Sequence, residues 1–305
     1  MISILIPVYN REVGALVASL HAQLQAVTIT GEIIVMDDGS ENESTKNANR
    51  GLPGLFNTLL YIELPVNTGR NLIRHELAAA ARFDLFIFLD ADSSFPDTAW
   101  LKRYLNAAAG NAVIMGGRSY KPETPGAASS LHFHYGQQRE QLGASRRNKH
   151  PYRSFMACNF LVSRNQFAQL ITDRRLHGYC HEDTFMGLQF EQLRVLLVHI
   201  DNPVYHEGID EDQLFMKKQA EALQNLRYLY QTYHTRYHFN SGIKLIRVYQ
   251  KLQTTAAGRY ILQKLALQQD ALKKNTLRSH RLLLLDLWKL GVYHQLCAAP
   301  GSNKI

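Results

Sequence analysis

Short apolar runs of strand length alternate with helix-forming segments in the first part of the chain, and this alternation restricts the fold more than any other feature. The runs lie at 2–8, 32–36, 59–64, 85–89 and 112–115. Leu16, Leu20 and Leu24 recur at helical spacing, residues 72–81 favour helix, and Pro96 suits the start of another helix. The pattern predicts an α/β fold whose mostly parallel, mixed sheet is flanked by helices. Such sheets bind ligands beyond the carboxyl ends of their strands.

Composition and cysteine content exclude several classes of protein. The chain has 305 residues, of which 46% are hydrophobic and 20% charged, as in ordinary globular proteins. Cys158, Cys180 and Cys297 are too far apart for a disulfide framework or a zinc motif, which favours a reducing compartment. We find no signal peptide and no uncharged apolar run of the ~18 residues that a transmembrane helix needs. We therefore expect a cytoplasmic protein.

Positive charge is concentrated at the C-terminal end. Residues 241–305 hold eleven Lys and Arg against two acidic residues, a net charge of +9, whereas residues 1–240 carry −1. Strand signals end near residue 210, and we expect 231–305 to form a basic helical C-terminal region. A basic helical tail can bind an anionic membrane surface, which would make the protein peripheral on the inner face of the membrane, or it can bind nucleic acid. The alternative is a solvated helical face. Because no nucleic-acid motif is recognised, no nucleic-acid partner is expected.

Residues 121–157 interrupt the alternation with prolines, glycines and a basic stretch. We expect a long surface excursion that is partly helical, because long irregular segments in compact domains are usually functional. Its basic side chains suit an acidic or phosphorylated acceptor, or form a solvated loop; they are Arg139, Arg146, Arg147, Lys149 and Arg153.

Two acidic pairs directly follow predicted strands. Asp90 and Asp92 come after the strand 85–89, and alternation in an extended chain points both carboxylates the same way. Adjacent carboxylates suit Mg²⁺ or Mn²⁺, although such a pair is also common in turns and caps. Asp37 and Asp38 follow the second strand and precede Gly39. They form either an ordinary strand-to-turn element or a carboxylate that accepts hydrogen bonds from a nucleobase.

Glu182 and Asp183 stand at the predicted start of a helix. Acidic residues there are stabilised by free amide groups, but an acid at a helix start beside a cleft is also well placed as a general base. His206 follows a strand-like run and can complete a divalent-metal site, or it is a hydrogen-bonded structural histidine.

In order along the chain, five segments resemble the motifs of family 2 glycosyltransferases over roughly residues 2–230; they are Pro7-Val8-Tyr9-Asn10-Arg11, Asp37-Asp38-Gly39-Ser40, Asn67-Thr68-Gly69-Arg70-Asn71, Asp90-Ala91-Asp92 and Glu182-Asp183. The resemblance implies a GT-A fold over residues 1–230. Its nucleotide-binding half would span about 1–118 and its acceptor half about 119–230. It also implies a transferase that uses a nucleotide-sugar, usually with inversion and a divalent metal.

The resemblance also implies roles for individual residues. Pro7, Tyr9 and Arg11 match a loop that packs around the nucleobase, most often uracil. Asp38 matches the acid that recognises this base, and Arg70 matches the basic residue near the donor. Asp90 and Asp92 match the acids that bind the metal and the ribose-diphosphate, and His206 matches a third metal ligand. Asp183, or its neighbour Glu182, matches the general base.

The implied activity is inverting, Mn²⁺- or Mg²⁺-dependent transfer of a hexosyl or hexosaminyl group. The donor would be a UDP-sugar and the acceptor a hydroxyl of a glycan or lipid-linked acceptor in cell-surface polysaccharide synthesis. No Gln-x-x-Arg-Trp follows the acid pair, which argues against a processive polymerase. Two alternatives stay open: a catalytically inactive relative that binds glycan or scaffolds a membrane complex, and a sugar nucleotidyltransferase. The latter usually carries a Gly-rich loop where this chain has residues 7–11.

Overall fold

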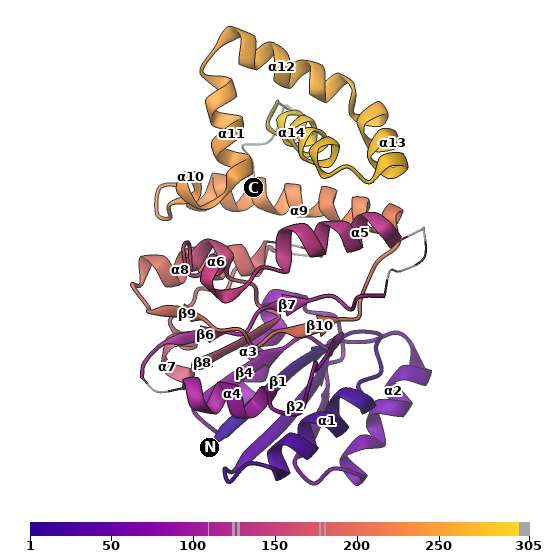
Figure 1. The fold of residues 1–305 in the computed structure, drawn as a ribbon, viewed down its shortest axis with the longest axis vertical. Helices are drawn as coiled ribbons and strands as arrows, with labels where there is room; N and C mark the ends of the chain where they lie inside the picture. Colours follow the sequence, from indigo (N-terminus) through magenta and orange to yellow (C-terminus); the bar gives the residue numbers. More distant parts are fainter. Residues whose placement is uncertain (109, 124–125, 127–128, 177, 180, 299–305) are drawn as a thin grey trace. The chain divides into compact units, whose positions relative to one another are not determined.

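The computed structural model describes residues 1–108, 110–123, 126, 129–176, 178–179 and 181–298. The chain divides into two compact units that are interleaved in sequence (Figure 1). The first, here the α/β unit, comprises residues 1–121, 140–177 and 182–208. The second, the helical unit, comprises 122–139, 178–181 and 209–305. The domain boundaries expected at about 118 and 230 stay predictions.

A seven-stranded sheet forms the centre of the α/β unit. Its strand order is β3-β2-β1-β4-β8-β6-β9. Only β8 runs antiparallel to its neighbours β4 and β6, so the predicted mostly parallel, mixed sheet is confirmed. The five predicted strands all form, and their bounds are β1 Ile2–Val8, β2 Gly31–Asp37, β3 Leu59–Glu63, β4 Leu85–Leu89 and β6 Val113–Met115. The remaining two are β8 Asn159–Ser163 and β9 Leu197–His199.

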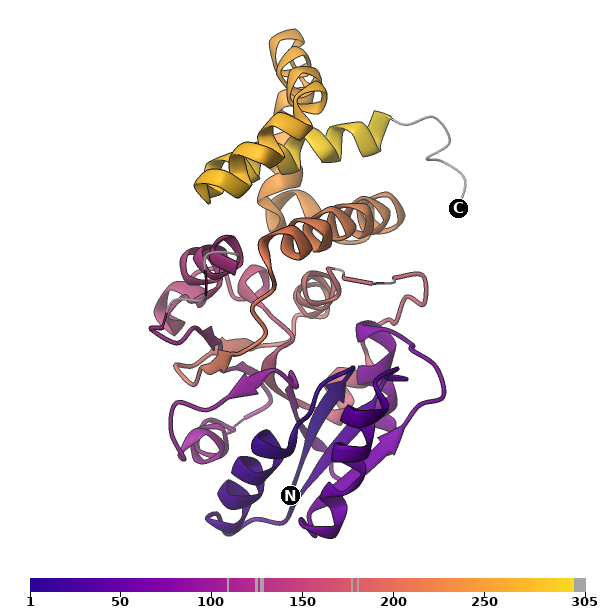
Figure 2. The same cartoon turned by 90° about the vertical axis from the view of Figure 1, so that its right-hand side faces the viewer.

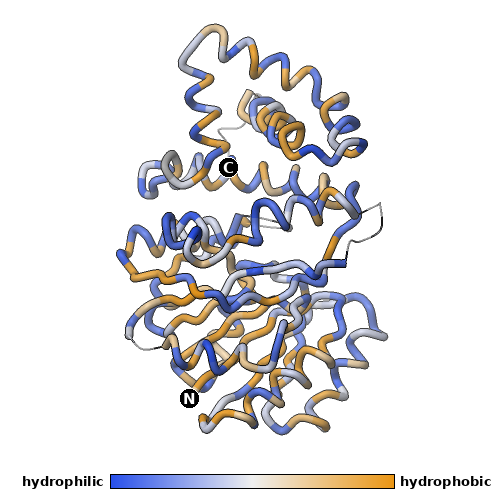
Figure 3. The backbone as a smooth tube through the Cα atoms, in the orientation of Figure 1, coloured by the Kyte–Doolittle hydropathy of each residue, from blue (hydrophilic) through white to orange (hydrophobic). Residues whose placement is uncertain are grey.

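Helices cover both faces of this sheet (Figure 2). Strand alternation explains the two layers, because Ile4 and Ile6 of β1 join the hydrophobic cluster that contains Leu16 and Leu20, whereas Leu5 joins the opposite cluster. Orange, apolar stretches are frequent in the part of the tube that forms this sheet in Figure 3. The helices of this unit are α1 Gly14–Gln25, α2 Glu43–Arg50, α3 Arg70–Ala80, α4 Trp100–Ala107, α6 Ala144–Arg147, α7 Arg164–Ala168 and α8 Glu182–Gln192.

A second, small sheet brings distant residues to the end of β4. It joins β5 Ser93–Ser94, β10 Val204–His206 and β7 Arg118–Ser119 in the order β5-β10-β7. Strand β10 is antiparallel to β5, with His206 opposite Ser93. The pairing therefore places His206 beside the Asp90–Asp92 segment, although more than a hundred residues separate them in the chain.

The helical unit is built from α5 Ser130–Tyr135, a π-helical turn at Gly136–Glu140 whose last residue belongs to the α/β unit, and α9 Asp212–Tyr233 to α14 Leu282–Ala298. Between them lie α10 Phe239–Gly242, α11 Lys244–Gln253, α12 Ala256–Leu267 and α13 Gln269–Ser279. Its core packs Leu131 of α5 and Phe215 of α9 against Leu285 and Trp288 of α14. The helical C-terminal region is thus confirmed. None of the helices described is long and apolar enough to cross a membrane.

Phe88 tests how the sheet is stabilised. It is fully buried in β4, with its ring 5.0 Å from that of Phe160 and 4.8 Å from that of Phe167. Phe88→Ala should lower the free energy of unfolding by about 3–5 kcal/mol, because it removes a large buried ring and leaves a cavity. Urea unfolding would be followed by Trp100 fluorescence in a Trp288→Phe background. Leu60→Ala, at an exposed position of β3, is the control; equal stability of both variants would contradict the account.

Candidate active site

Hydrogen bonds join the loops that follow β1 and β2 at the carboxyl edge of the sheet. The backbone amide of Asn10 donates to Ser40 Oγ at 2.7 Å, and Asn10 Oδ1 accepts from the amides of Glu41 and Asn42 at 2.9 and 3.0 Å. Asn10 adopts a left-handed conformation with φ 49°, which asparagine tolerates better than most residues. The two loops therefore form one wall of the site.

Asp38 anchors the next loop of this wall. Its Oδ1 accepts from the amide and the hydroxyl of Thr68, both at 2.7 Å, and its Oδ2 accepts from the amide of Gly69 at 2.9 Å. Gly39 has φ +68°, and a Cβ there would lie 2.6 Å from the Val66 backbone, so only glycine fits. The carboxylate expected to recognise a base is thus already holding the Thr68–Gly69 backbone, and base recognition by Asp38 stays a prediction.

The other residues expected around a nucleobase lie close to this wall. Tyr9 is exposed, directly after β1, and Pro7 is partly buried within the strand. The positive charge of Arg11 lowers the pKa of Asp92, so Arg11 lies within electrostatic range of that carboxylate. Their contact with a base is not tested by these observations and stays a prediction.

Asp90, at the end of β4, is held between two arginines. Arg74 Nη2 lies 3.1 Å from Asp90 Oδ1, and Arg118 Nη2 lies 3.2 Å from Asp90 Oδ2. Arg74 is only 2% exposed, and its Nη1 also reaches Glu182 Oε1 at 3.4 Å. Buried charges persist only when they are paired, so these groups fix one another.

Arg118 extends the ion-pair network on its other side. Its Nη1 lies 3.2 Å from Glu140 Oε2, which also accepts a short hydrogen bond from the hydroxyl of Tyr120. Burial and the negative charge of Glu140 raise the pKa of Tyr120, so it stays a hydrogen-bond donor. One network thus runs from the start of α8 through Asp90 to the residues that follow β6.

Asp92 pairs with His206, not with the arginines that hold Asp90. Their Oδ2 and Nε2 atoms lie 3.1 Å apart, as the pairing of β5 with β10 requires. Burial alone would raise the pKa of Asp92. The hydrogen bond and charge of His206 lower this pKa, and the cations Arg118 and Arg11 lower it further, so the carboxylate is ionised. A side chain on Gly208 would collide with Asp92 Oδ2, so glycine keeps the space beside the carboxylate open.

The expected metal ligands are only partly assembled. Among the described residues no group of three or more His, Cys, Asp and Glu side chains could hold a metal ion. The structure brings Asp92 and His206 together, whereas Asp90 faces Arg74 and Arg118. Asp92 Oδ1 is nevertheless buried without a hydrogen-bond partner in the part of the chain described. A buried, unpartnered carboxylate oxygen beside an imidazole fits a divalent ion.

Glu182 and Asp183 begin α8, as the sequence predicts, but their surroundings differ. Glu182 is buried against Arg74, whereas Asp183 Oδ1 accepts from the amide of Thr184 at 2.6 Å. Burial and the neighbouring negative charge of Glu182 raise the pKa of Asp183 to about 7. A carboxyl group that changes its protonation state near neutral pH is suited to general-base chemistry.

Sequence reasoning missed Arg74, Arg118 and Glu140. Arg70, which the family resemblance indicates, is exposed at the first position of α3, whereas Arg74 lies one turn later on the buried face with Asn71. A charged residue on the face that also carries Ile73, Leu77 and Ala78 was the available signal. Arg118 closely follows β6, whose direction matches that of β4, so the strand-end rule points to it. We find no sequence signal for Glu140.

One expected acceptor residue has a structural role instead. Arg147 is buried and donates to the carbonyl oxygens of Leu142, Gly116 and Ile200 at 2.8–2.9 Å. Its guanidinium therefore ties the excursion to the sheet, and the expectation that it meets an acidic acceptor is wrong. The prolines and glycines near Arg147 in the sequence favour a surface loop. The backbone carbonyls that Arg147 contacts cannot be identified from the sequence.

Solved structures share this fold at low sequence identity. PcManGT, a mannosyltransferase from Pyrobaculum calidifontis solved in complex with GDP-Man and Mn²⁺, matches with a TM-score of 0.59 and 12% identity, over 98% of this chain and 88% of that one. A mycobacterial protein of known crystal structure matches with a TM-score of 0.50 and 14% identity, over 76% of this chain and 74% of that one. No curated protein matches the sequence significantly.

The sequence itself decides the family. The model of glycosyl transferase family 2 matches residues 3–170, which include the loops after β1, β2 and β4 and the ion-paired residues Arg74, Asp90 and Arg118. The chain therefore belongs to glycosyl transferase family 2 and is a glycosyltransferase with a GT-A fold.

Proposed function

We propose that this enzyme transfers a hexosyl or hexosaminyl group from a UDP-sugar, with inversion, to a hydroxyl of a glycan or lipid-linked acceptor in cell-surface polysaccharide synthesis. The observation that carries the proposal is the continuous ion-pair network from Glu182 through Arg74 and Asp90 to Arg118. It links the start of α8, where a base is expected, with the end of β4, where a donor diphosphate is expected.

The donor side of the proposal rests on Asp92 and His206. These two residues would hold Mn²⁺ or Mg²⁺, and the imidazole favours Mn²⁺ because Mg²⁺ prefers oxygen ligands. A bound ion would offset negative charge on the departing nucleoside diphosphate. Arg11 and Arg118, whose charges reach Asp92, add positive potential for phosphate oxygens. Asp90 contributes by fixing Arg74 and Arg118.

The acceptor side rests on Asp183. Glu182 is ion-paired with Arg74, which leaves Asp183 as the better base of the two. Asp183 would accept the proton of the acceptor hydroxyl as that oxygen attacks the anomeric carbon. A single displacement of the nucleotide by this oxygen inverts the anomeric configuration. Alcohol protons are far too weakly acidic to leave unaided at neutral pH, so a positioned carboxylate is needed.

We also propose that the enzyme lies on the inner face of an anionic membrane through residues 241–305. Helix α12 exposes Tyr260, Ile261 and Leu267, which are 60%, 46% and 74% exposed, beside Arg259 and Lys264. Apolar and basic side chains mixed on one exposed helix are typical of helices that lie in a lipid interface.

Asp92→Ala should weaken metal-dependent nucleotide binding at least tenfold, because it removes the carboxylate that completes the ion's protein ligands. Calorimetric titration with UDP and with GDP, each with and without Mn²⁺, measures the effect and identifies the nucleobase that the enzyme prefers. Asp97→Ala removes an exposed carboxylate near the same strand end and should leave binding unchanged. An unaltered Mn²⁺ dependence in Asp92→Ala would remove Asp92 from the metal site.

The pH dependence of transfer separates Asp183 from Glu182. Because Asp183 accepts a proton only when ionised, kcat/KM should rise with pH through an apparent pKa of about 7. Asp183→Asn should lose about 10²–10⁴ in kcat and retain UDP binding. Glu182→Gln removes a negative charge beside Asp183, so it should move the rising limb to lower pH. If Glu182→Gln abolished transfer and Asp183→Asn did not, the two roles would have to be exchanged.

Flotation with vesicles tests the membrane proposal. Deleting residues 241–305 is unsuitable, because α14 supplies Leu285 and Trp288 to the core of the helical unit. Ile261→Asp combined with Leu267→Asp should instead abolish flotation with phosphatidylcholine–phosphatidylglycerol vesicles. Leu55→Asp, an exposed apolar position of the α/β unit, should float like the unchanged chain. Equal flotation of all three proteins would contradict the proposal.

A further inference from the structure

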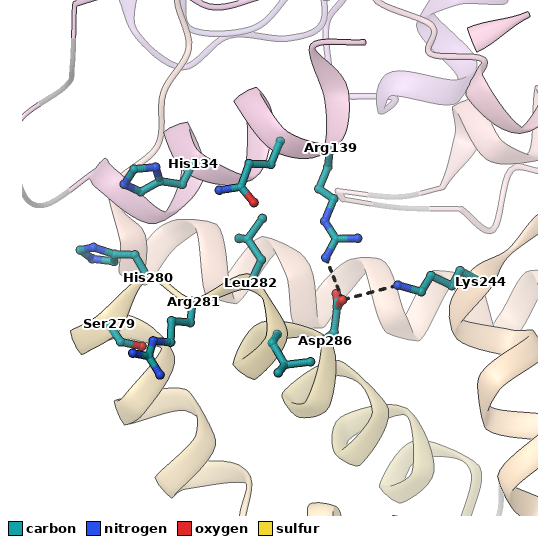
Figure 4. Close-up of a pocket in the computed structure, with 10 residues that line it drawn as sticks. His134, Arg139, Lys244, Ser279, His280, Arg281, Leu282 and Asp286 are labelled. Atoms are coloured by element: carbon teal, nitrogen blue, oxygen red, sulfur yellow. Dashed lines mark hydrogen bonds and ion pairs between the residues drawn. The ribbon is translucent and has the colours of Figure 1, made fainter. Parts of the chain in front are cut away.

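The helical unit contains a cavity of about 640 Å³ that plays no part in the proposed transfer. It is lined by side chains from α5, the π-helical turn, α11, the end of α13 and the start of α14 (Figure 4). We call it the cationic pocket, because its charged and titratable lining residues are His134, Arg139, Lys244, His280, Arg281 and one acid, Asp286. The cavity is larger than a bare ion needs and falls in the size range of small-molecule sites.

One end of the cationic pocket shows how its cations converge on an anionic oxygen. Arg139 Nη2 lies 2.8 Å from Asp286 Oδ2, and Lys244 Nζ lies 3.9 Å from the same atom. Both side chains point to this carboxylate in Figure 4. A single carboxylate therefore interacts with two cations, and one positive charge at this end of the pocket is not balanced by Asp286.

The other end has a different balance of charge. Arg281 has no ion pair with any residue that the structure describes, and it directly precedes α14. The first turn of this 17-residue helix holds no acidic residue, so no acid within that turn offsets the positive end of the helix dipole. His280 Nε2 lies 2.9 Å from Asp212 Oδ2, which holds the imidazole in place, and His134 lies on the same side of the pocket in Figure 4. Asp212 is thus the acid at this end, and it pairs with His280 and not with Arg281.

We propose that the cationic pocket binds a phosphate monoester. A guanidinium presents parallel N–H donors that match phosphate oxygens, and Arg281 supplies a positive charge that neither Asp212 nor Asp286 pairs. The remaining volume accommodates the esterified group, and Leu282 supplies an apolar edge. The ester can come from a soluble phosphorylated sugar or polyol, or from a lipid headgroup. This inference goes beyond the proposed transfer and does not depend on it.

The test uses the full chain and two phosphate monoesters. Calorimetry with glycerol 3-phosphate and co-sedimentation with phosphatidylcholine vesicles, with and without phosphatidic acid, probe the soluble and lipid sources. Arg281→Gln should weaken binding of the favoured probe about tenfold, because it removes a charge-assisted hydrogen bond. Asp286→Asn should tighten binding severalfold, because it frees Arg139 and Lys244 for the ester. Arg174→Gln, an exposed site in the α/β unit, matches the charge change of Arg281→Gln and should have no effect.

The outcomes separate the source of the ester from failure of the proposal. Opposite shifts by Arg281→Gln and Asp286→Asn with glycerol 3-phosphate assign a soluble ester. The same opposite shifts seen only with phosphatidic acid vesicles assign a lipid headgroup. Absence of binding to both probes, or affinities that neither substitution changes, would overturn the proposal. A probe that bound only at the donor site would have an affinity that neither substitution changes. The test therefore does not depend on whether the transfer mechanism is correct.

Discussion

The ion pairs of the half-buried Asp90 carboxylate with Arg74 and Arg118 are the interactions on which the α/β unit's site depends. Arg74 also pairs with Glu182, and Arg118 also pairs with Glu140. Every charged residue of this cluster therefore has an oppositely charged partner within it. Removing one partner would strand a buried charge, which costs far more than an exposed ion pair contributes. The cluster therefore fixes the relative positions of α3, the end of β4, β7 and the start of α8, which are remote in sequence.

Asp92 has a different hydrogen-bond partner from Asp90, which forms the ion pairs with the two arginines. Two neighbouring carboxylates at one strand end thus have separate partners, cations for Asp90 and an imidazole for Asp92. A similar division holds at the start of α8, where Arg74 compensates Glu182 while burial and the charge of Glu182 raise the pKa of Asp183. Pairs of acids whose environments differ are typical of sites in which one acid has a structural role and the other reacts.

Sequence reasoning succeeded where the signal was local. Apolar runs such as 85–89 specify a buried strand, and acids that follow such runs lie at the sheet edge because every parallel strand ends there. Sequence reasoning failed where tertiary packing determines which side chains contact one another. The two-residue strand β5 has no pattern to read, yet it sets His206 beside Asp92. Burial of Arg74 and Arg147 depends likewise on carbonyl and carboxylate groups supplied by distant segments.

We propose that Asp92 and His206 together hold a divalent ion during transfer. Electron spin-echo spectroscopy of Mn²⁺ bound to the full chain with UDP tests this most directly, because a directly bonded imidazole nitrogen modulates the echo. The account predicts nitrogen modulation that disappears in His206→Gln while UDP still binds. Bound Mn²⁺ with no nitrogen modulation, or modulation unchanged in His206→Gln, would contradict it.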